Sequence, residues 1–125
     1  MSNAPVVYAC SGCSNVARIA HDIALNLDSD GLAEMSCVSG VIGNVIPVRE
    51  IATSAQQIIV IDGCGLQCTK ACLDACQIKV DHHFVITEFD IEKRGKWQDS
   101  IADNGKAMTH IYAELLKSGI SFRAT

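Results

Sequence analysis

The hydrophobic residues of this chain fall into short apolar runs, separated by longer stretches in which apolar positions recur with helical spacing. The clearest run, Ile-Ile-Val-Ile at residues 58–61, is apolar at every position. Strands buried on both faces are typical of the centre of a parallel sheet, so this run predicts a central strand. Weaker runs predict three more strands, at residues 5–9, 33–38 and 83–89.

Helices are predicted between these strands and after the last one. The first has apolar residues at helical spacing as far as Leu27, with Ser14 as its candidate N-cap and Gly31 just past its end. The others are a helix that starts at Pro47, a helix at residues 66–76 and a long helix at Ile101–Lys117.

Strands that alternate with crossover helices indicate a parallel sheet covered on both faces. We therefore expect one α/β domain over residues 1–125, of the Rossmann or flavodoxin type. Its predicted architecture is a three-layer sandwich, with a mostly parallel four-stranded sheet and helices on both faces. The polar residues 90–100 are expected to form a surface loop.

Composition narrows the class of protein. The chain has 125 residues and a net charge of −4, with no basic block, which argues against binding to nucleic acid. It has no apolar run of about 18 residues and no recognisable signal peptide, so we expect a cytoplasmic protein that does not span a membrane. In a reducing compartment its 7 cysteines favour metal binding or thiol chemistry over a disulfide framework.

Three cysteines recur at a fixed interval. Cys10, Cys37 and Cys64 are 27 residues apart, about the length of one strand and its following helix, and each follows a predicted strand. All three are therefore expected at the carboxyl edge of the sheet, where open α/β sheets bind their ligands. Thiolates that share one zinc ion stand about 3.8 Å apart, and neighbouring strands about 4.8 Å, so the three can converge. Cys68 lies one helical turn after Cys64 and is the candidate fourth ligand.

The residues around these cysteines carry a family resemblance. The motifs are Cys10-Ser11-Gly12, Cys37-Val38-Ser39-Gly40 and Ile61-Asp62-Gly63-Cys64, followed by Cys68. With them the chain resembles the DGC-domain family of proposed zinc-binding proteins, named after its Asp-Gly-Cys motif. The resemblance implies zinc as the cofactor and metal ligation by Cys10, Cys37, Cys64 and Cys68. It implies no particular reaction.

The chain departs from the family pattern in ways that leave alternatives open. It has a glycine at position 65, where proline is common, and three additional cysteines, at positions 13, 72 and 76. Which four cysteines bind metal, and whether the metal is zinc, therefore stays open. One alternative is an iron–sulfur protein that uses Cys68, Cys72 or Cys76.

A second alternative is a thiol-dependent enzyme for thiol–disulfide or sulfur transfer. Cys10 or Cys64 would be its nucleophile, and the resolving partner would be Cys13, Cys68 or Cys72. The other interpretation is a zinc protein that senses or handles the metal. This role is favoured over that of a purely structural zinc, because a domain of this size is expected to fold without a metal ion. The expected partner is a metal ion, and the apolar content is also compatible with a homo-oligomer, whose size the sequence does not indicate.

The other candidate groups are assigned supporting roles. His82 and His83 are expected at the amino edge of the sheet, opposite the cysteines, and His21 and His110 are expected to be surface or packing residues of helices. Asp62 is the acid closest to the cysteines in the sequence, and we expect its carboxylate to brace the loop by accepting hydrogen bonds from backbone N–H groups.

Overall fold

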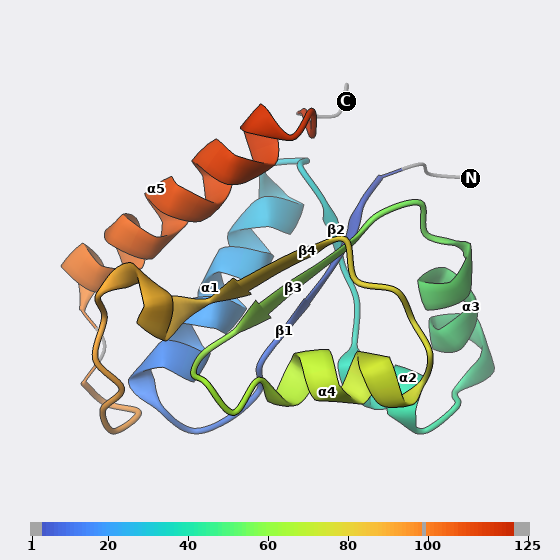
Figure 1. Cartoon of the computed structure of the whole chain (residues 1–125), viewed down its shortest axis with the longest axis horizontal. Coiled ribbons are helices and arrows are strands. Elements are labelled where there is room, and N and C mark those ends of the chain that lie inside the picture. The colour runs from blue at the N-terminus through green and yellow to red at the C-terminus, as the bar shows by residue number, and fades with distance from the viewer. Residues whose placement is uncertain (1–3, 99, 122–125) are drawn as a thin grey trace.

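The computed structural model describes residues 4–98 and 100–121; residues 1–3, 99 and 122–125 of the predicted domain lie outside that description. Its centre is a four-stranded sheet in the order β2-β1-β3-β4, and all three pairs of neighbouring strands are parallel (Figure 1). The strands are β1 (Val6–Ala9), β2 (Glu34–Met35), β3 (Ile58–Asp62) and β4 (His82–Val85). After β2 the chain crosses to the far side of β1, so the strand order switches between β1 and β3.

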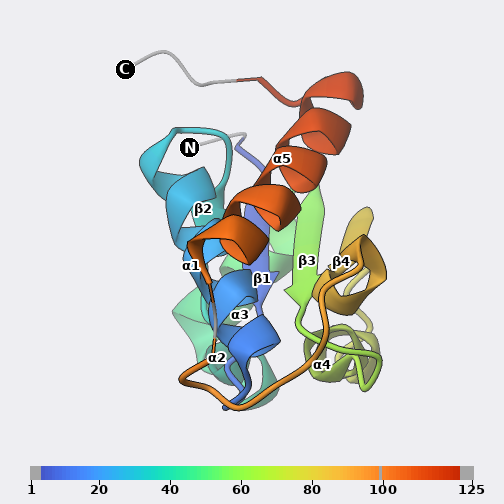
Figure 2. The same ribbon diagram turned by 90° about the vertical axis from the view of Figure 1, so that its left-hand side faces the viewer.

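Helices cover both faces of this sheet. They are α1 (Asn15–Ser29), α2 (Val38–Ile42), α3 (Ile46–Ser54), α4 (Cys68–Ala75) and α5 (Ile101–Lys117), with a 3-10 helix η1 (Ile86–Phe89). In Figure 2, α1 and α5 lie side by side on the face toward the viewer, and the other three α-helices lie on the opposite face. The prediction of a three-layer α/β sandwich is confirmed.

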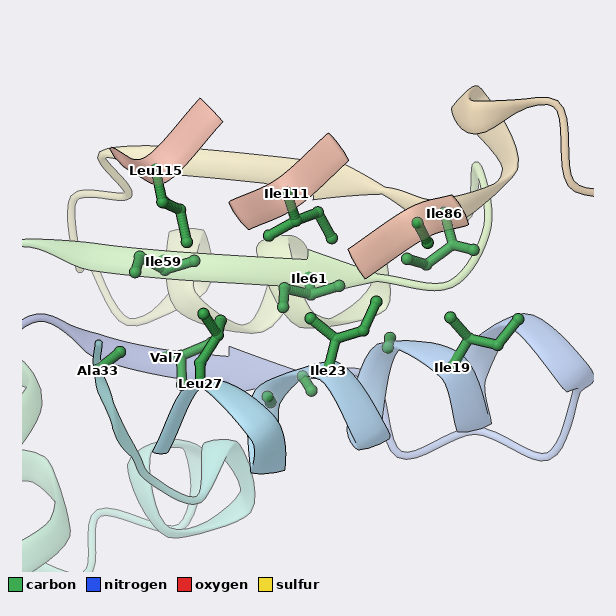
Figure 3. Close-up of a cluster of buried hydrophobic side chains, with 14 of the residues drawn as sticks. Val7, Ile19, Ile23, Leu27, Ala33, Ile59, Ile61, Ile86, Ile111 and Leu115 are labelled. Carbon is green, nitrogen blue, oxygen red and sulfur yellow. The ribbon is translucent and has the colours of Figure 1, made fainter. Parts of the chain in front are cut away.

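The buried side chains form two clusters, one on each face of the sheet. Strand residues alternate between them, because successive side chains of a strand point to opposite faces. On β1, for example, Val7 packs with α1 and α5, whereas Tyr8 packs with the short helices. Figure 3 shows the first cluster, in which Ile23 and Ile111 meet Ile61 over the sheet. Every residue of β3 is buried, as predicted for a central strand.

The ends of α1 agree with the prediction. The Ser14 hydroxyl accepts a hydrogen bond from the N–H of Ala17 at 3.2 Å, so it caps the helix. Gly31 follows the helix with a φ of 77°, in the left-handed region that glycine adopts without strain. The predicted start of the next long helix is also confirmed, because Pro47 lies in the first turn of α3.

Two predicted strands are shorter than expected. The run at residues 33–38 pairs only at Glu34–Met35, and Val38 begins α2, a five-residue helix that the sequence did not predict. Gly40 lets α2 pack against α3, since a Cβ at this position would lie 2.7 Å from Val48 Cγ1. The run at residues 83–89 starts at His82 and becomes the 3-10 helix after Val85. There the N–H of Thr87 donates to the carbonyl of Gly63 instead of continuing the ladder.

The helix predicted at residues 66–76 also begins later than expected. Gln67 has a φ of 52°, a left-handed conformation that separates the exposed Leu66 from the first turn of α4 at Cys68. The predicted surface loop is confirmed for residues 90–98 and 100. Within residues 4–98 and 100–121, none of the helices combines the length and the apolar character needed to cross a membrane.

Candidate functional site

Three cysteines lie at the carboxyl ends of three adjacent strands, where the sequence predicted them. Ala9 of β1 pairs with Ile61 of β3, and the N–H of Cys10 continues this ladder by donating to the Ile61 carbonyl at 3.0 Å. On the other side of β1, the paired residues end at Met35, two positions before Cys37. Cys10 thus follows the strand in the middle, with Cys37 and Cys64 following its two neighbours.

Asp62 fixes the loop that carries Cys64. Its carboxylate is 1% exposed and accepts hydrogen bonds from the N–H groups of Thr69 at 2.9 Å and Lys70 at 3.3 Å. These N–H groups belong to the first turn of α4, whose N-cap residue Gln67 makes no side-chain capping bond. A carboxylate at the end of β3 therefore caps α4 from outside the helix. The predicted bracing role of Asp62 is confirmed.

Gly63 is required because two backbones touch at this point. A Cβ here would lie 2.8 Å from the backbone N of Ala17 and 2.9 Å from the backbone C of Val16, both in the first turn of α1. Backbone atoms cannot move away as a flexible side chain could, so only glycine fits without a shift of the chain. In the Asp-Gly-Cys motif, Asp62 thus caps α4, Gly63 packs against the backbone of α1, and Cys64 carries the thiol.

The two neighbouring histidines of β4 differ in their partners. His82 Nε2 lies 2.8 Å from Oε1 of Gln57, just before β3, which agrees with a place near the amino edge. His83 Nε2 lies 2.8 Å from Oδ2 of Asp62, so the expectation that His83 stands opposite the cysteine loops is wrong. The physical reason is that the buried Asp62 carboxylate draws the imidazole toward the carboxyl edge.

The two helical histidines also differ. His110 stacks on Phe89 with ring centroids 5.2 Å apart, which is a packing role. His21 is exposed on α1 and lines two neighbouring cavities of about 550 and 270 Å³, which open at the cysteine edge. Ser11 also lines both of them, with Cys37 in the larger and Cys10 in the smaller. The sequence pattern did not predict this position of His21.

A basic residue that the sequence analysis missed lies beside Cys64. Lys93 Nζ donates a hydrogen bond to Cys64 Sγ at 3.4 Å. The loop that carries Lys93 is held against α1 by the buried Asn15, whose amide donates to the Glu92 carbonyl at 2.9 Å and accepts from the Arg94 N–H. The run Lys93-Arg94-Gly95-Lys96 was visible in the sequence, but nothing local to it indicated which cysteine it would meet.

Cys37 is exposed and has hydrogen-bond donors around its sulfur. Its Sγ lies 2.8 Å from Oγ of Ser39, two residues into α2. The Ser39 hydroxyl and then the N–H of Gly40 hold the pKa of the Cys37 thiol below its ordinary value, because both donate to the thiolate. Cys37 is therefore more readily ionised at neutral pH than an ordinary cysteine.

The cysteines of α4 form a stripe along one side of the helix. Cys68 at its first position is exposed, whereas Cys72 and Cys76 are half-buried. Burial raises the pKa of the Cys72 thiol, and the nearby thiols of Cys68 and Cys76 raise it further. Cys76 Sγ lies 3.9 Å from the Val41 carbonyl oxygen of α2, as a weak S–H donor does.

The thiols are free but do not converge as they stand. All seven cysteines are unpaired by disulfides. Across residues 4–98 and 100–121, no three or more His, Cys, Asp or Glu side chains are gathered so that they could hold a metal ion. Cys37 instead faces Ser39 and Cys64 faces Lys93. The backbone brings the strand-end cysteines to one edge of the sheet. The thiols of Cys37 and Cys64 contact Ser39 and Lys93 there, and not one another.

The motifs and the fold together define the class of this protein. It belongs to the DGC-domain family, whose model matches residues 6–111. It is also 48% identical to the anaerobic and virulence modulator AnvM of Pseudomonas aeruginosa, over 90 residues that make up 72% of this chain and 69% of AnvM. No solved structure matches the chain.

Proposed function

We propose that this DGC-domain protein binds one zinc ion through the thiolates of Cys10, Cys37, Cys64 and Cys68, and senses or handles that metal. The observation that carries the proposal is the position of three of these residues at the carboxyl ends of adjacent strands, with Cys68 at the start of the helix that follows. Four thiolates are a donor set that zinc prefers. A reducing compartment such as the cytoplasm would keep them unoxidised.

Metal binding at this site requires two side chains to change partners. The Cys37 thiol would leave Ser39, and the Cys64 thiol would leave Lys93. The Lys93 ammonium lies close enough to offset part of the negative charge that four thiolates leave around a divalent ion. The Cys37 side chain is exposed, and exposed side chains rotate within nanoseconds.

The proposal favours reversible binding over a purely structural ion. The two hydrophobic clusters bury the sheet on both faces without any contribution from a metal. A domain of this kind folds first and binds afterwards, unlike small zinc domains that unfold without their ion. The relative AnvM is named as a modulator, and a metal site that fills and empties suits such a role.

The test is metal content and thiol protection measured on the same sample. Protein purified without oxygen is expected to carry about one zinc per chain, with four thiols that react with a disulfide reagent only after a chelator is added. Cys37→Ser should abolish zinc binding. Cys13→Ser is the matched control, because Cys13 is exposed and outside the proposed ligand set. Full zinc occupancy in the Cys37→Ser protein would refute this ligand set.

A second candidate function, thiol-dependent chemistry, is favoured by the lowered pKa of Cys37 beside a cavity of about 550 Å³. Here Cys37 would be the reactive thiol, rather than Cys10 or Cys64 as the sequence alone indicated. The Cys10→Ser protein separates the two functions. Under the zinc proposal it loses the metal, whereas under the second it stays metal-free and retains one rapidly alkylated cysteine, Cys37.

A further inference from the structure

We propose that Cys72 and Cys76 form a second metal site on α4, separate from the strand-end cysteines, which binds one Cu(I) ion between two thiolates. Both residues lie outside the ligand set proposed above. Their positions, their burial and the lack of a third ligand among the described residues point to a soft ion with two-coordinate geometry. The inference stands whether or not the strand-end site binds zinc.

The spacing of the two residues suits a two-coordinate ion. The N–H of Cys76, the C-cap residue of α4, is shared between the carbonyls of Leu73 at 3.1 Å and Cys72 at 3.3 Å, so the last turn of the helix is tightened but includes Cys76. Residues four apart on a helix have Cβ atoms about 5–6 Å apart. With the zinc–sulfur bond length of about 2.3 Å as a guide, thiolates on opposite sides of one ion stand about 4.6 Å apart. The two thiols can therefore share an ion by rotating about their Cα–Cβ bonds.

The surroundings hold the Cys76 sulfur in the seam between α4 and α2. Cys76 packs against the smaller hydrophobic cluster, with its thiol near the Val41 carbonyl. That carbonyl also accepts a hydrogen bond from the Asn44 N–H at 3.1 Å, so it keeps a donor when Cys76 turns away. Cys72 is half-buried one helical turn earlier on α4. An ion between two half-buried thiols would be partly shielded from water.

The ligand count decides the class of ion. Within residues 4–98 and 100–121, no third His, Cys, Asp or Glu joins this pair in a metal-holding group. Zinc prefers four ligands, whereas thiolates select Cu(I), an ion that two of them satisfy. On binding, each thiol releases one proton to solvent and forms one sulfur–copper bond. The ion enters and remains as Cu(I), so no electron is transferred and no oxidant is needed.

The test uses a full-length variant in which only Cys72 and Cys76 remain. The other five cysteines are exposed or half-buried, so serine is expected to be tolerated at each: Cys10, Cys13, Cys37, Cys64 and Cys68. Under anaerobic conditions the variant should withdraw one Cu(I) per chain from the coloured chelator bathocuproine disulfonate. Adding Cys76→Ser in the same background should abolish that withdrawal, and X-ray absorption of the loaded variant should report two sulfur neighbours.

Three results would overturn the proposal. They are no withdrawal of Cu(I) by the two-cysteine variant, equal withdrawal after Cys76→Ser, and a copper environment with three or more protein ligands. If the two-cysteine variant loses its far-UV circular dichroism, the same question is put to the otherwise native chain. There the double change Cys72→Ser, Cys76→Ser should lower the Cu(I) capacity by one and leave zinc content at the strand-end site unchanged. An unaltered capacity would again refute the site.

Discussion

The two faces of the sheet are built differently. One face is covered by the two long helices α1 and α5, and its cluster contains the larger share of the fully buried side chains. The other is covered by three helices of five to nine residues, and its cluster is smaller. Apolar side chains of α3 and the turn before it remain exposed on this second face, among them Ile46 at 65%.

The cysteines are divided between these two faces. Cys10 and Cys64 are half-buried against the larger cluster, whereas Cys37 and Cys68 are exposed at the starts of short helices. A metal bound by all four would thus join a well-packed half of the domain to a lightly packed half. Two of the four candidate thiols thus lie against the cluster that contributes most to stability, and the other two lie on the lightly packed face.

The largest expected effect comes from the well-packed face. Ile23 of α1 is fully buried in the larger cluster (Figure 3), so Ile23→Ala should lower the free energy of unfolding by about 4 kcal/mol. Urea unfolding followed by far-UV circular dichroism measures it. Leu25→Ala on the same helix is the control, since Leu25 is half-exposed and should cost less than about 1 kcal/mol. Equal costs would show that the larger cluster does not dominate stability.

The next largest effect on stability is expected at Asp62, whose carboxylate bonds both α4 and His83 of β4. Asp62→Ala leaves the Thr69 N–H without its acceptor and removes the partner of His83, which should cost about 3 kcal/mol of unfolding free energy. Asp62→Asn retains one oxygen acceptor, so urea titrations should place it between Asp62→Ala and the native protein. If both variants match native stability, Asp62 does not cap α4.

A smaller effect is expected at the contact between the Asp-Gly-Cys loop and α1. Gly63→Ala forces a methyl group against backbone atoms of Val16 and Ala17, and should cost about 2 kcal/mol. Thermal unfolding of the metal-free protein would measure this cost. Gly65→Ala is the matched control, because a Cβ there meets nothing within 4 Å and should change stability by less than about 1 kcal/mol. If Gly65→Ala lowered the stability as much as Gly63→Ala does, the proposed contact between Gly63 and the backbone of α1 would be contradicted.

The smallest effect falls on reactivity rather than on stability. Ser39→Ala removes the hydroxyl that lowers the pKa of Cys37, so that pKa should rise and less thiolate should be present at neutral pH. Alkylation of Cys37, followed by peptide mass spectrometry, should slow severalfold, and its pH–rate profile should move to higher pH. Ser11→Ala alters the same cavity elsewhere and should leave the profile in place. An unchanged profile in the Ser39→Ala protein would rule out this role of the hydroxyl.

The sequence predicted the features that depend on local pattern. Each of these features is encoded within a few residues: the uniformly apolar β3, the Ser14 cap and the helix start at Pro47. Once the strands are predicted, the positions of their carboxyl ends are predicted as well. The placement of three cysteines at one edge could therefore be predicted. Their use as metal ligands stays a prediction.

The features it missed depend on distant contacts. A helix as short as α2 is not stable alone and forms because Gly40 packs against Val48. Lys93 reaches Cys64 because Asn15, far away in the sequence, holds its loop. The pairing of His83 with Asp62 likewise depends on the register of two strands, which neither residue encodes alone.

The tethered Asp-Gly-Cys loop also has a consequence for the entropy of ligand binding. Hydrogen bonds fix this loop at Gly63 through Thr87, at Cys64 through Gln67, and at the start of α4 through Asp62. Its backbone freedom is therefore lost during folding, and a ligand that binds Cys64 and Cys68 removes little more. Cys37, by contrast, stands on a short helix of the lightly packed face. For the zinc ion proposed above, most of the remaining loss of backbone freedom on binding would therefore fall on the segment that carries Cys37.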